Sequence, residues 1–199
     1  MKKQDILEAA LDLACEKGLD NLSMSMIANE VHLKKSSLYS HFKSKEELIQ
    51  SMYGYFRDKA KEQRGVVGIN YDVLFEGRSF QDILKECVNS YRDMVLSSDL
   101  FRFYKVILSQ RVYNPMAARI MVEETNTMIQ ATKLLFYALS AKKIVDFTNP
   151  DAAALSFAMS VHSIINFECD AQNANVYDAD GLMDIYIEEF CRIYGGNSE

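Results

Sequence analysis

The chain has 199 residues, a formal net charge of −6 at pH 7 and 49% hydrophobic residues, the composition of an ordinary globular protein. Two prolines and eight glycines leave few turn signals, so long helices are expected. The polar first residues do not look like a signal peptide, and we see no apolar run of membrane-spanning length. We therefore expect a cytoplasmic protein with no membrane partner.

The cysteines argue against a structural metal or a disulfide framework. Cys15, Cys87, Cys169 and Cys191 form no C-x-x-C pair and have no histidine cluster beside them, so no metal and no cofactor is expected. Buried or half-buried thiols are the favoured interpretation. A redox sensor would need an accessible thiolate with a cationic activator, which the neighbouring sequence does not supply.

Three short helices are predicted at the start of the chain. Apolar residues at helical spacing indicate an amphipathic helix over residues 3–17, ended by Gly18 in a left-handed position. Ser23 is a candidate N-cap for a second helix over residues 24–31, and a third is expected over residues 35–42. The core side chains of the last two helices would be Ile27, Leu38 and Phe42.

The rest of the chain is also expected to be helical. Ser44 to Glu47 match a capping box in which Glu47 reaches back to the cap, so a fourth helix should run from Lys45 to about Arg64. Residues 65–79 are a connection of uncertain form. Further helices are expected over residues 80–96, 99–111, 115–140 and 150–170, followed by a last helix that Asp178 or Asp180 caps and that ends before Gly195.

A short basic segment stands out from the acidic whole. Lys34, Lys35, Lys43 and Lys45 lie between Val31 and Glu46 without an acidic residue among them, so this segment carries +4 and the remainder −10. Local charge of this kind attracts phosphates, although a solvated basic loop is an alternative. The order of the elements favours the former, because two short helices joined by a tight turn and braced by a first helix form a helix-turn-helix.

The same residues resemble a known family. Ile6 to Ala10, Gly18, Ile27-Ala28 and the run from Leu38 to Leu48 closely resemble the TetR family of transcriptional regulators, over roughly the first fifty residues. The resemblance implies an all-α homodimer with a helix-turn-helix DNA-binding domain at residues 1–46. A helical effector-binding and dimerisation domain at residues 47–199 would follow, with residues 45–64 as the linking helix.

Roles for individual residues follow from the resemblance. Tyr39 and His41 match residues that contact phosphates, and Lys45 matches a lysine at the start of the fourth helix. Phenol, imidazole and ammonium groups can all donate to phosphate oxygens. The full predicted set of DNA-binding residues is Ser25, Lys34, Lys35, Ser36, Ser37, Tyr39, His41, Lys43 and Lys45.

Three residues depart from the family pattern. His32 stands where the family has a turn glycine, Lys34 where it has a small capping residue, and Ser36 at another frequent glycine. Histidine tolerates a left-handed conformation comparatively well, and Lys34 could exchange a cap for a phosphate contact. We therefore expect an unusual operator sequence with the fold retained.

The C-terminal half offers only residue types for an effector site. Aromatic, methionine and polar side chains could line an apolar cavity, with core packing as the competing interpretation; they are Tyr91, Met94, Phe101, Phe103, Tyr104, Met121, Met128, Phe136, His162 and Asn166. The last two helices would form the dimer bundle, with intrachain packing as its alternative, through Leu155, Met159, Ile165, Leu182, Ile185, Tyr186 and Ile193.

These features predict a regulator and not an enzyme. No nucleophile elbow, phosphate loop or metal-ligand motif accompanies the three histidines. We expect a repressor that a small-molecule effector of unknown identity releases from a palindromic operator in double-stranded DNA. A transcriptional activator of the same fold, or a helical interaction module whose DNA-binding domain has lost its function, are the alternatives.

Overall fold

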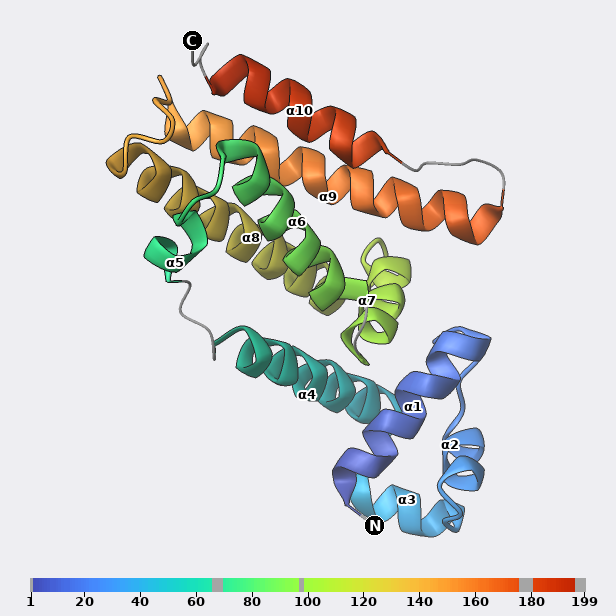
Figure 1. Cartoon of the computed structure of the whole chain (residues 1–199). Helices are drawn as coiled ribbons and strands as arrows, with labels where there is room; N and C mark the ends of the chain where they lie inside the picture. Colours follow the sequence, from blue (N-terminus) through green and yellow to red (C-terminus); the bar gives the residue numbers. More distant parts are fainter. Residues whose placement is uncertain (1, 66–69, 97–98, 176–180, 196–199) are drawn as a thin grey trace. The chain divides into compact units, whose positions relative to one another are not determined.

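The computed structural model describes residues 2–65, 70–96, 99–175 and 181–195 (Figure 1). Every regular element within these ranges is a helix, which confirms the all-α prediction. The chain divides into two compact units. Unit 1 comprises residues 1–68 and 95–122, and unit 2 comprises residues 69–94 and 123–199.

Unit 1 contains the predicted three-helix start of the chain. Its helices are α1 (Lys3–Lys17), α2 (Met24–Glu30), α3 (Lys35–His41), α4 (Lys45–Gly65), α7 (Asp99–Gln110) and the first turns of α8 (Pro115–Ala141). The Ser23 hydroxyl accepts a hydrogen bond from the amide of Met26 at 3.2 Å, which confirms this residue as the cap of α2. Gly18 ends α1 with φ +80° and ψ 146°, a positive φ outside the left-handed helical region that we expected.

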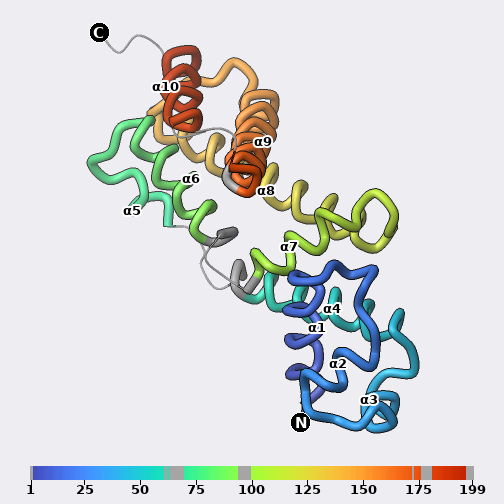
Figure 2. Tube along the Cα trace, turned by 90° about the vertical axis from the view of Figure 1, so that its right-hand side faces the viewer, coloured from blue at the N-terminus to red at the C-terminus, as the bar shows by residue number. Residues whose placement is uncertain are grey.

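One hydrophobic core joins these helices. Ile6, Ile27, Leu38 and Leu48 come from four different helices, and each is completely excluded from solvent. The core continues through α7 and the first turns of α8, so a segment about a hundred residues away in sequence belongs to the same unit as the helix-turn-helix. Figures 1 and 2 show α7 beside the C-terminal half of α1, with α3 near the opposite end of α1.

Unit 2 is a helical body with an aromatic core. It contains α5 (Tyr71–Phe75), α6 (Phe80–Leu96), the later part of α8, α9 (Pro150–Ala174) and α10 (Leu182–Tyr194). Phe136 and Phe147 stack with centroids 4.5 Å apart, and Phe157 and Phe190 lie 4.8 Å apart. Asn114 and Asn149 cap α8 and α9 through their side-chain oxygens, as the two Asn-Pro pairs predict.

Several helix boundaries differ from the sequence predictions. The helix α5 lies within the segment whose form was left open, and α9 runs four residues beyond the predicted end. The N-cap of α10 is Gly181 in the left-handed conformation, whereas Asp178 and Asp180, the predicted caps, lie outside the described residues. At α4, the Glu47 carboxylate accepts a hydrogen bond from the amide of Lys43, not from that of Ser44 as predicted.

The expectation that no apolar stretch has membrane-spanning length is wrong for α9. Residues 150–171 are long and apolar enough to cross a membrane by length and composition alone. Seven side chains of this stretch, however, are buried within unit 2, as in the core helix of a globular body; they are Ala153, Ala154, Phe157, Ala158, Val161, Ile165 and Ala171.

The division into compact units does not coincide with the predicted boundary at residue 46. Residues 1–46 lie entirely within unit 1, together with α4 and α7. By sequence, unit 1 contains 15 lysines and arginines against 11 acidic residues, whereas unit 2 contains 7 against 17. The net charges are therefore +4 and −10, so the positive charge is concentrated on the unit that carries the helix-turn-helix. The division of roles between residues 1–46 and 47–199 stays a prediction.

Candidate nucleic-acid interface

The turn between α2 and α3 is built without glycine. His32 adopts a left-handed conformation with φ 53°, which histidine tolerates at modest cost. The His32 amide donates to the carbonyl of Asn29 at 3.1 Å, and the Leu33 amide donates to that of Ala28 at 2.8 Å. Because both amides have partners, the departure from the usual turn glycine leaves the geometry of the motif intact.

Two buried side chains hold α3 in place. Leu38 is completely buried, and Phe42, the residue that ends the helix, is 1% exposed, as the sequence predicted. The Lys34 side chain makes no capping hydrogen bond within the described part of the chain and is exposed. One side of α3 is thus anchored in the core, while the other side is exposed and accessible to a ligand.

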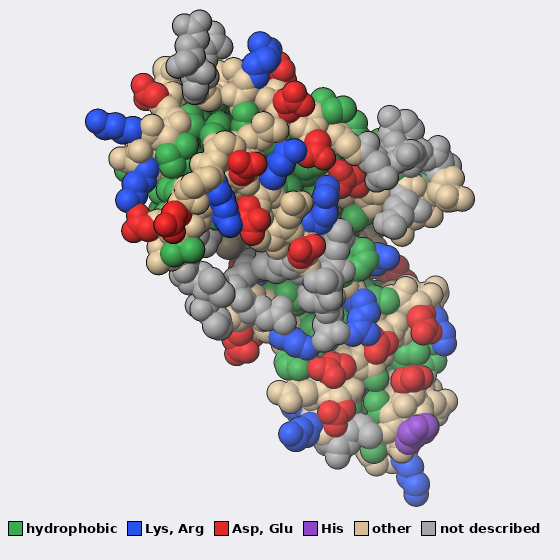
Figure 3. Space-filling view, viewed as in Figure 1, with side chains coloured by type: hydrophobic (Ala, Val, Ile, Leu, Met, Phe, Trp, Pro, Cys, Tyr) green, Lys and Arg blue, Asp and Glu red, His purple; other side chains and the backbone are tan. Residues whose placement is uncertain are grey.

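The structure brings the predicted DNA-binding residues together on one exposed surface around α3, which we call the α3 surface. Ser25, Lys34, Lys35, Ser36 and Lys43 are exposed, and Ser37 and His41 are half-buried. The Tyr39 side chain is 43% exposed, so its hydroxyl can reach a phosphate. Figure 3 shows basic side chains, in blue, and histidine, in purple, at the end of unit 1 where α3 lies.

Lys45 is arranged differently from the other cations. Its Nζ atom donates a hydrogen bond to the carbonyl oxygen of Asp20 at 3.1 Å, so its ammonium group ties the start of α4 to the segment after α1. The Ser44 hydroxyl accepts from the Glu47 amide at 3.1 Å. A phosphate contact by Lys45, which stays a prediction, would require the ammonium group to exchange or share this partner.

Sequence reasoning missed two lysines that the fold adds to this surface. The Nζ atom of Lys3, on α1, lies 5.3 Å from the centroid of the ring of Phe42, the residue that precedes Lys43 in the sequence. The amide of Lys2 donates to the Asp5 carboxylate at 2.8 Å, which orders the start of α1. Both lysines are exposed, and their position beside the end of α3 follows only from tertiary packing.

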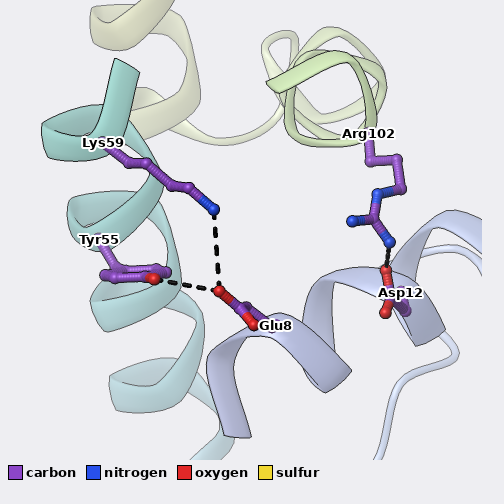
Figure 4. A network of polar contacts seen from close by, with 5 residues as sticks. All are labelled: Glu8, Asp12, Tyr55, Lys59 and Arg102. Atoms are coloured by element: carbon purple, nitrogen blue, oxygen red, sulfur yellow. Dashed lines mark hydrogen bonds and ion pairs between the residues drawn. The ribbon is translucent and has the colours of Figure 1, made fainter. Parts of the chain in front are cut away.

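A polar network joins α1 to α4 and α7 within unit 1 (Figure 4). The Glu8 carboxylate accepts a hydrogen bond from the Tyr55 hydroxyl at 3.1 Å and pairs with Lys59 at 3.8 Å. Asp12 pairs with Arg102 of α7, and the Cys15 thiol donates to the Arg102 carbonyl at 3.3 Å. These contacts fix α1, the helix that braces α2 and α3, against the helices that lead away from the interface.

The predicted effector-site residues divide between the two units. Met121 is 8% exposed, Phe103 is 2% exposed, and both belong to the core of unit 1, with Phe101 and Tyr104 half-buried in the same unit. In unit 2, Phe136 is completely buried, whereas the half-buried residues are Tyr91, Met128, His162 and Asn166. The side chain of Met94 lies outside the described residues.

A cavity of about 490 Å³ lies elsewhere, between the C-terminal ends of α8 and α10. It contains none of the predicted effector-site residues, and its lining is Ser140, Lys143, Ile144, Val145, Asp146, Tyr194 and Gly195. Within the described ranges, no group of three histidine, cysteine or acidic side chains could hold a metal ion.

The predicted dimer residues have mixed environments. Leu155 and Met159 on α9 are 48% and 41% exposed, and Ile185 and Ile193 on α10 are 66% and 60% exposed. Ile165 is buried in the core, and Leu182 is half-buried. Tyr186 packs 5.7 Å from the Phe157 ring, and burial raises the pKa of its phenol, so this side chain is largely part of the intrachain core.

Comparison with known proteins supports the resemblance seen in the sequence. Residues 6–52 match the model of the bacterial regulatory proteins of the tetR family. The chain is 41% identical over 58 residues, 29% of its length, to an HTH-type transcriptional regulator, YuxN, of Bacillus subtilis strain 168. It is 37% identical over 60 residues, 28% of its length, to IcaR of Staphylococcus epidermidis, a negative transcriptional regulator of the biofilm operon icaADBC. These matches cover 20% and 32% of the two relatives, so the chain spans at most about a third of their lengths.

The fold comparison extends the likeness over nearly the whole chain. A TetR-family transcriptional regulator from Mesorhizobium loti superposes with a TM-score of 0.66 and 22% identity, over 97% of this chain and 96% of the other. The family is one of regulators, in agreement with the prediction that the chain is not an enzyme. Residues 6–52 are thus similar to the tetR family of bacterial regulatory proteins, and the chain as a whole shares the fold of a TetR-family regulator.

Proposed function

We propose that the chain is a transcriptional regulator that binds double-stranded DNA through the α3 surface. The observation that carries this proposal is the exposure of lysine, serine and tyrosine side chains on one side of α3, while Leu38 and Phe42 anchor the other side. A helix held in this way can enter the major groove, with cations and hydroxyl groups available for phosphates and base edges. The net charge of +4 on unit 1 supplies attraction that does not depend on sequence.

The regulator acts as a homodimer on a palindromic operator. Leu155, Met159, Ile185 and Ile193 expose apolar surface on α9 and α10 that a second copy would bury. Two copies related by a two-fold axis present their recognition helices to half-sites about one DNA turn, roughly 34 Å, apart. Repression is the favoured direction, because IcaR, which shares the N-terminal segment, is a negative regulator. Activation is the alternative outcome of a reporter assay.

A small molecule bound in the C-terminal part would release the operator. The half-buried residues Tyr91, Met128, His162 and Asn166 supply aromatic, apolar and hydrogen-bonding groups in unit 2, the mixture that effector sites use. The contacts of Asp12 and Cys15 with Arg102 give movements of α7 a direct route to α1. An effector that favours a different spacing of the two α3 helices would shift the population away from the DNA-bound state. A cytoplasmic location accords with this role.

Fluorescence anisotropy tests DNA binding. The full chain is titrated against its own upstream DNA and a scrambled duplex, with Tyr39→Phe and Lys35→Ala as variants. Loss of one hydrogen bond to a phosphate costs about 1.5–3 kcal/mol, so we expect Tyr39→Phe to weaken binding about tenfold or more. Tyr137→Phe is the matched control, because Tyr137 is similarly exposed, at 50%, but lies on α8 in unit 2.

The result that contradicts this proposal is equal, weak binding of both duplexes by the wild type and by both tyrosine variants. Selection of bound fragments from genomic DNA then separates an incorrect choice of operator from a chain that does not bind DNA. Failure to select any fragment would favour a helical protein-interaction module.

A further inference from the structure

The turn between α7 and α8 carries an exposed group of side chains that we call the tip surface, formed by Arg111, Val112, Tyr113, Met116 and Arg119. The exposed fractions of Val112, Tyr113 and Met116 are 76%, 85% and 38%. Exposed apolar side chains of this size at adjacent positions are uncommon unless a partner covers them. Figure 2 shows the turn projecting from the body of unit 1 after α7.

The tip surface is built on an ordered turn. The amides of Tyr113 and Asn114 donate to the carbonyl of Gln110 at 3.0 and 2.8 Å, and the Asn114 side chain caps α8. Ala117, which is completely buried, anchors the first turn of α8 in the core of unit 1. The exposed side chains are thus held ready for contact, so little conformational entropy is lost on docking.

The segment that carries the tip surface is basic. Residues 100–122 include four basic side chains and no acidic one. Arg102 is paired with Asp12, whereas Arg111 and Arg119 are exposed and form no ion pair with the described residues. Tyrosine, methionine and arginine are the side chains most enriched at protein interfaces, so the chemistry favours an acidic protein surface with apolar residues.

We propose that the tip surface docks onto unit 2 of a second copy of this chain. The charge of −10 on unit 2 is complementary to the basic segment around the tip. A dimer formed only through α9 and α10 would bring two bodies of −10 together, and like charges oppose such an association. If the cationic tip surface of each copy contacts the acidic unit 2 of the other copy, the attraction offsets that repulsion. The same contact buries Val112 and Tyr113. The inference rests on the dimer of the proposed function and adds a second contact to it.

Photo-cross-linking tests which surface covers the tip. The full chain carrying Tyr113→p-benzoylphenylalanine, at natural isotope abundance, is mixed with ¹⁵N-labelled wild type until native mass spectrometry shows exchanged dimers. After illumination, we expect position 113 to be joined to ¹⁵N-labelled peptides within residues 69–94 or 123–199, which identifies unit 2 of the other copy. The inference would be overturned if position 113 were cross-linked only to its own copy or only to unit 1. It would also be overturned if exchanged dimers gave no cross-link at all.

A charge-matched pair of variants tests the energetics. Arg111→Glu, Tyr113→Ser removes both the cation and the ring, and we expect the dissociation constant of the dimer to rise about tenfold or more near 0.15 M salt. Lys17→Glu is the control, because Lys17 is also an exposed cation at the C-terminal end of a helix; its dissociation constant should change less than about twofold.

The outcomes separate this inference from the dimer itself. Variant dimers as tight as the wild type, by analytical ultracentrifugation, would contradict the tip contact and leave a dimer through α9 and α10 standing. A wild type that stays monomeric at all concentrations would overturn both, and its binding to DNA would still be measured independently by anisotropy.

Discussion

The two lysines that only the fold brings to the α3 surface allow a quantitative test of the interface. Lys3 lies over the Phe42 ring and Lys2 is exposed at the start of α1, so both ammonium groups can approach phosphates beside the helix-turn-helix. The perturbation is the double change Lys2→Ala, Lys3→Ala. This change leaves every predicted base-reading residue in place, so the affinity for operator DNA and the affinity for non-specific DNA should both decrease.

The expected magnitude follows from counterion release. Each phosphate contact contributes about 0.9 to the slope of log affinity against log salt, so losing two contacts should reduce the slope by about 1.8. Between about 50 and 200 mM salt, the affinity of the variant should therefore fall about 12-fold less than that of the wild type. Thermal unfolding should hardly change, because the cation–π contact of an exposed lysine such as Lys3 contributes only about 0.5–1 kcal/mol.

Anisotropy with a fixed duplex across this salt range measures the slope. The control, Lys17→Ala, Lys105→Ala, removes the same charge from unit 1 at exposed positions near the other end of α1 and on α7. It should lower affinity slightly while retaining the slope. An unchanged slope in the Lys2, Lys3 variant, or an equal reduction in the control, would refute the placement of these lysines in the interface.

Three further predictions concern stability. Leu38→Ala removes a completely buried side chain of α3 and should lower the free energy of unfolding by about 2–5 kcal/mol; a loss below about 0.5 kcal/mol in urea denaturation would show that α3 is not anchored as described. Tyr53→Phe removes a buried hydroxyl that has no hydrogen-bond partner among the described residues and should raise the free energy of unfolding by about 1 kcal/mol, whereas a loss of similar size would reveal a partner. Burial raises the pKa of the Cys87 thiol to about 11 from its ordinary value of 9.0, so the folded state keeps a proton that the unfolded state releases. The stability associated with this thiol is therefore complete below pH 9 and declines between pH 9 and about 11, by about 2 kcal/mol. Urea denaturation of Cys87→Ala against wild type over this pH range measures the decline, and identical pH dependence would contradict the burial of the thiol.

The helices and their caps could be predicted from the sequence because the information is local. Ser23, Asn114 and Asn149 lie within a few residues of the amides that they cap, and the spacing of Ile6, Ala10, Leu13 and Ala14 defines a buried stripe without reference to any other helix. Even the turn at His32 depends on a single residue's tolerance of positive φ. Most of the α3 surface could be predicted for the same reason, since its residues from Lys34 to Lys43 lie in one short segment.

The contacts between distant segments depend on tertiary structure. The sequence contains nothing that pairs Asp12 with Arg102, Lys45 with Asp20, or Lys3 with Phe42, because such partners are selected by how whole helices pack. The effector-site candidates show the same limit: aromatic and methionine residues suit a cavity or a core equally well by type, and packing buried Phe103, Met121 and Phe136 in the two cores. The sequence alone thus determined the long helices and the group of lysine, serine and tyrosine side chains on α3, whereas tertiary packing decided that residues 95–122 join unit 1, because that segment buries its apolar face against α1 and α4.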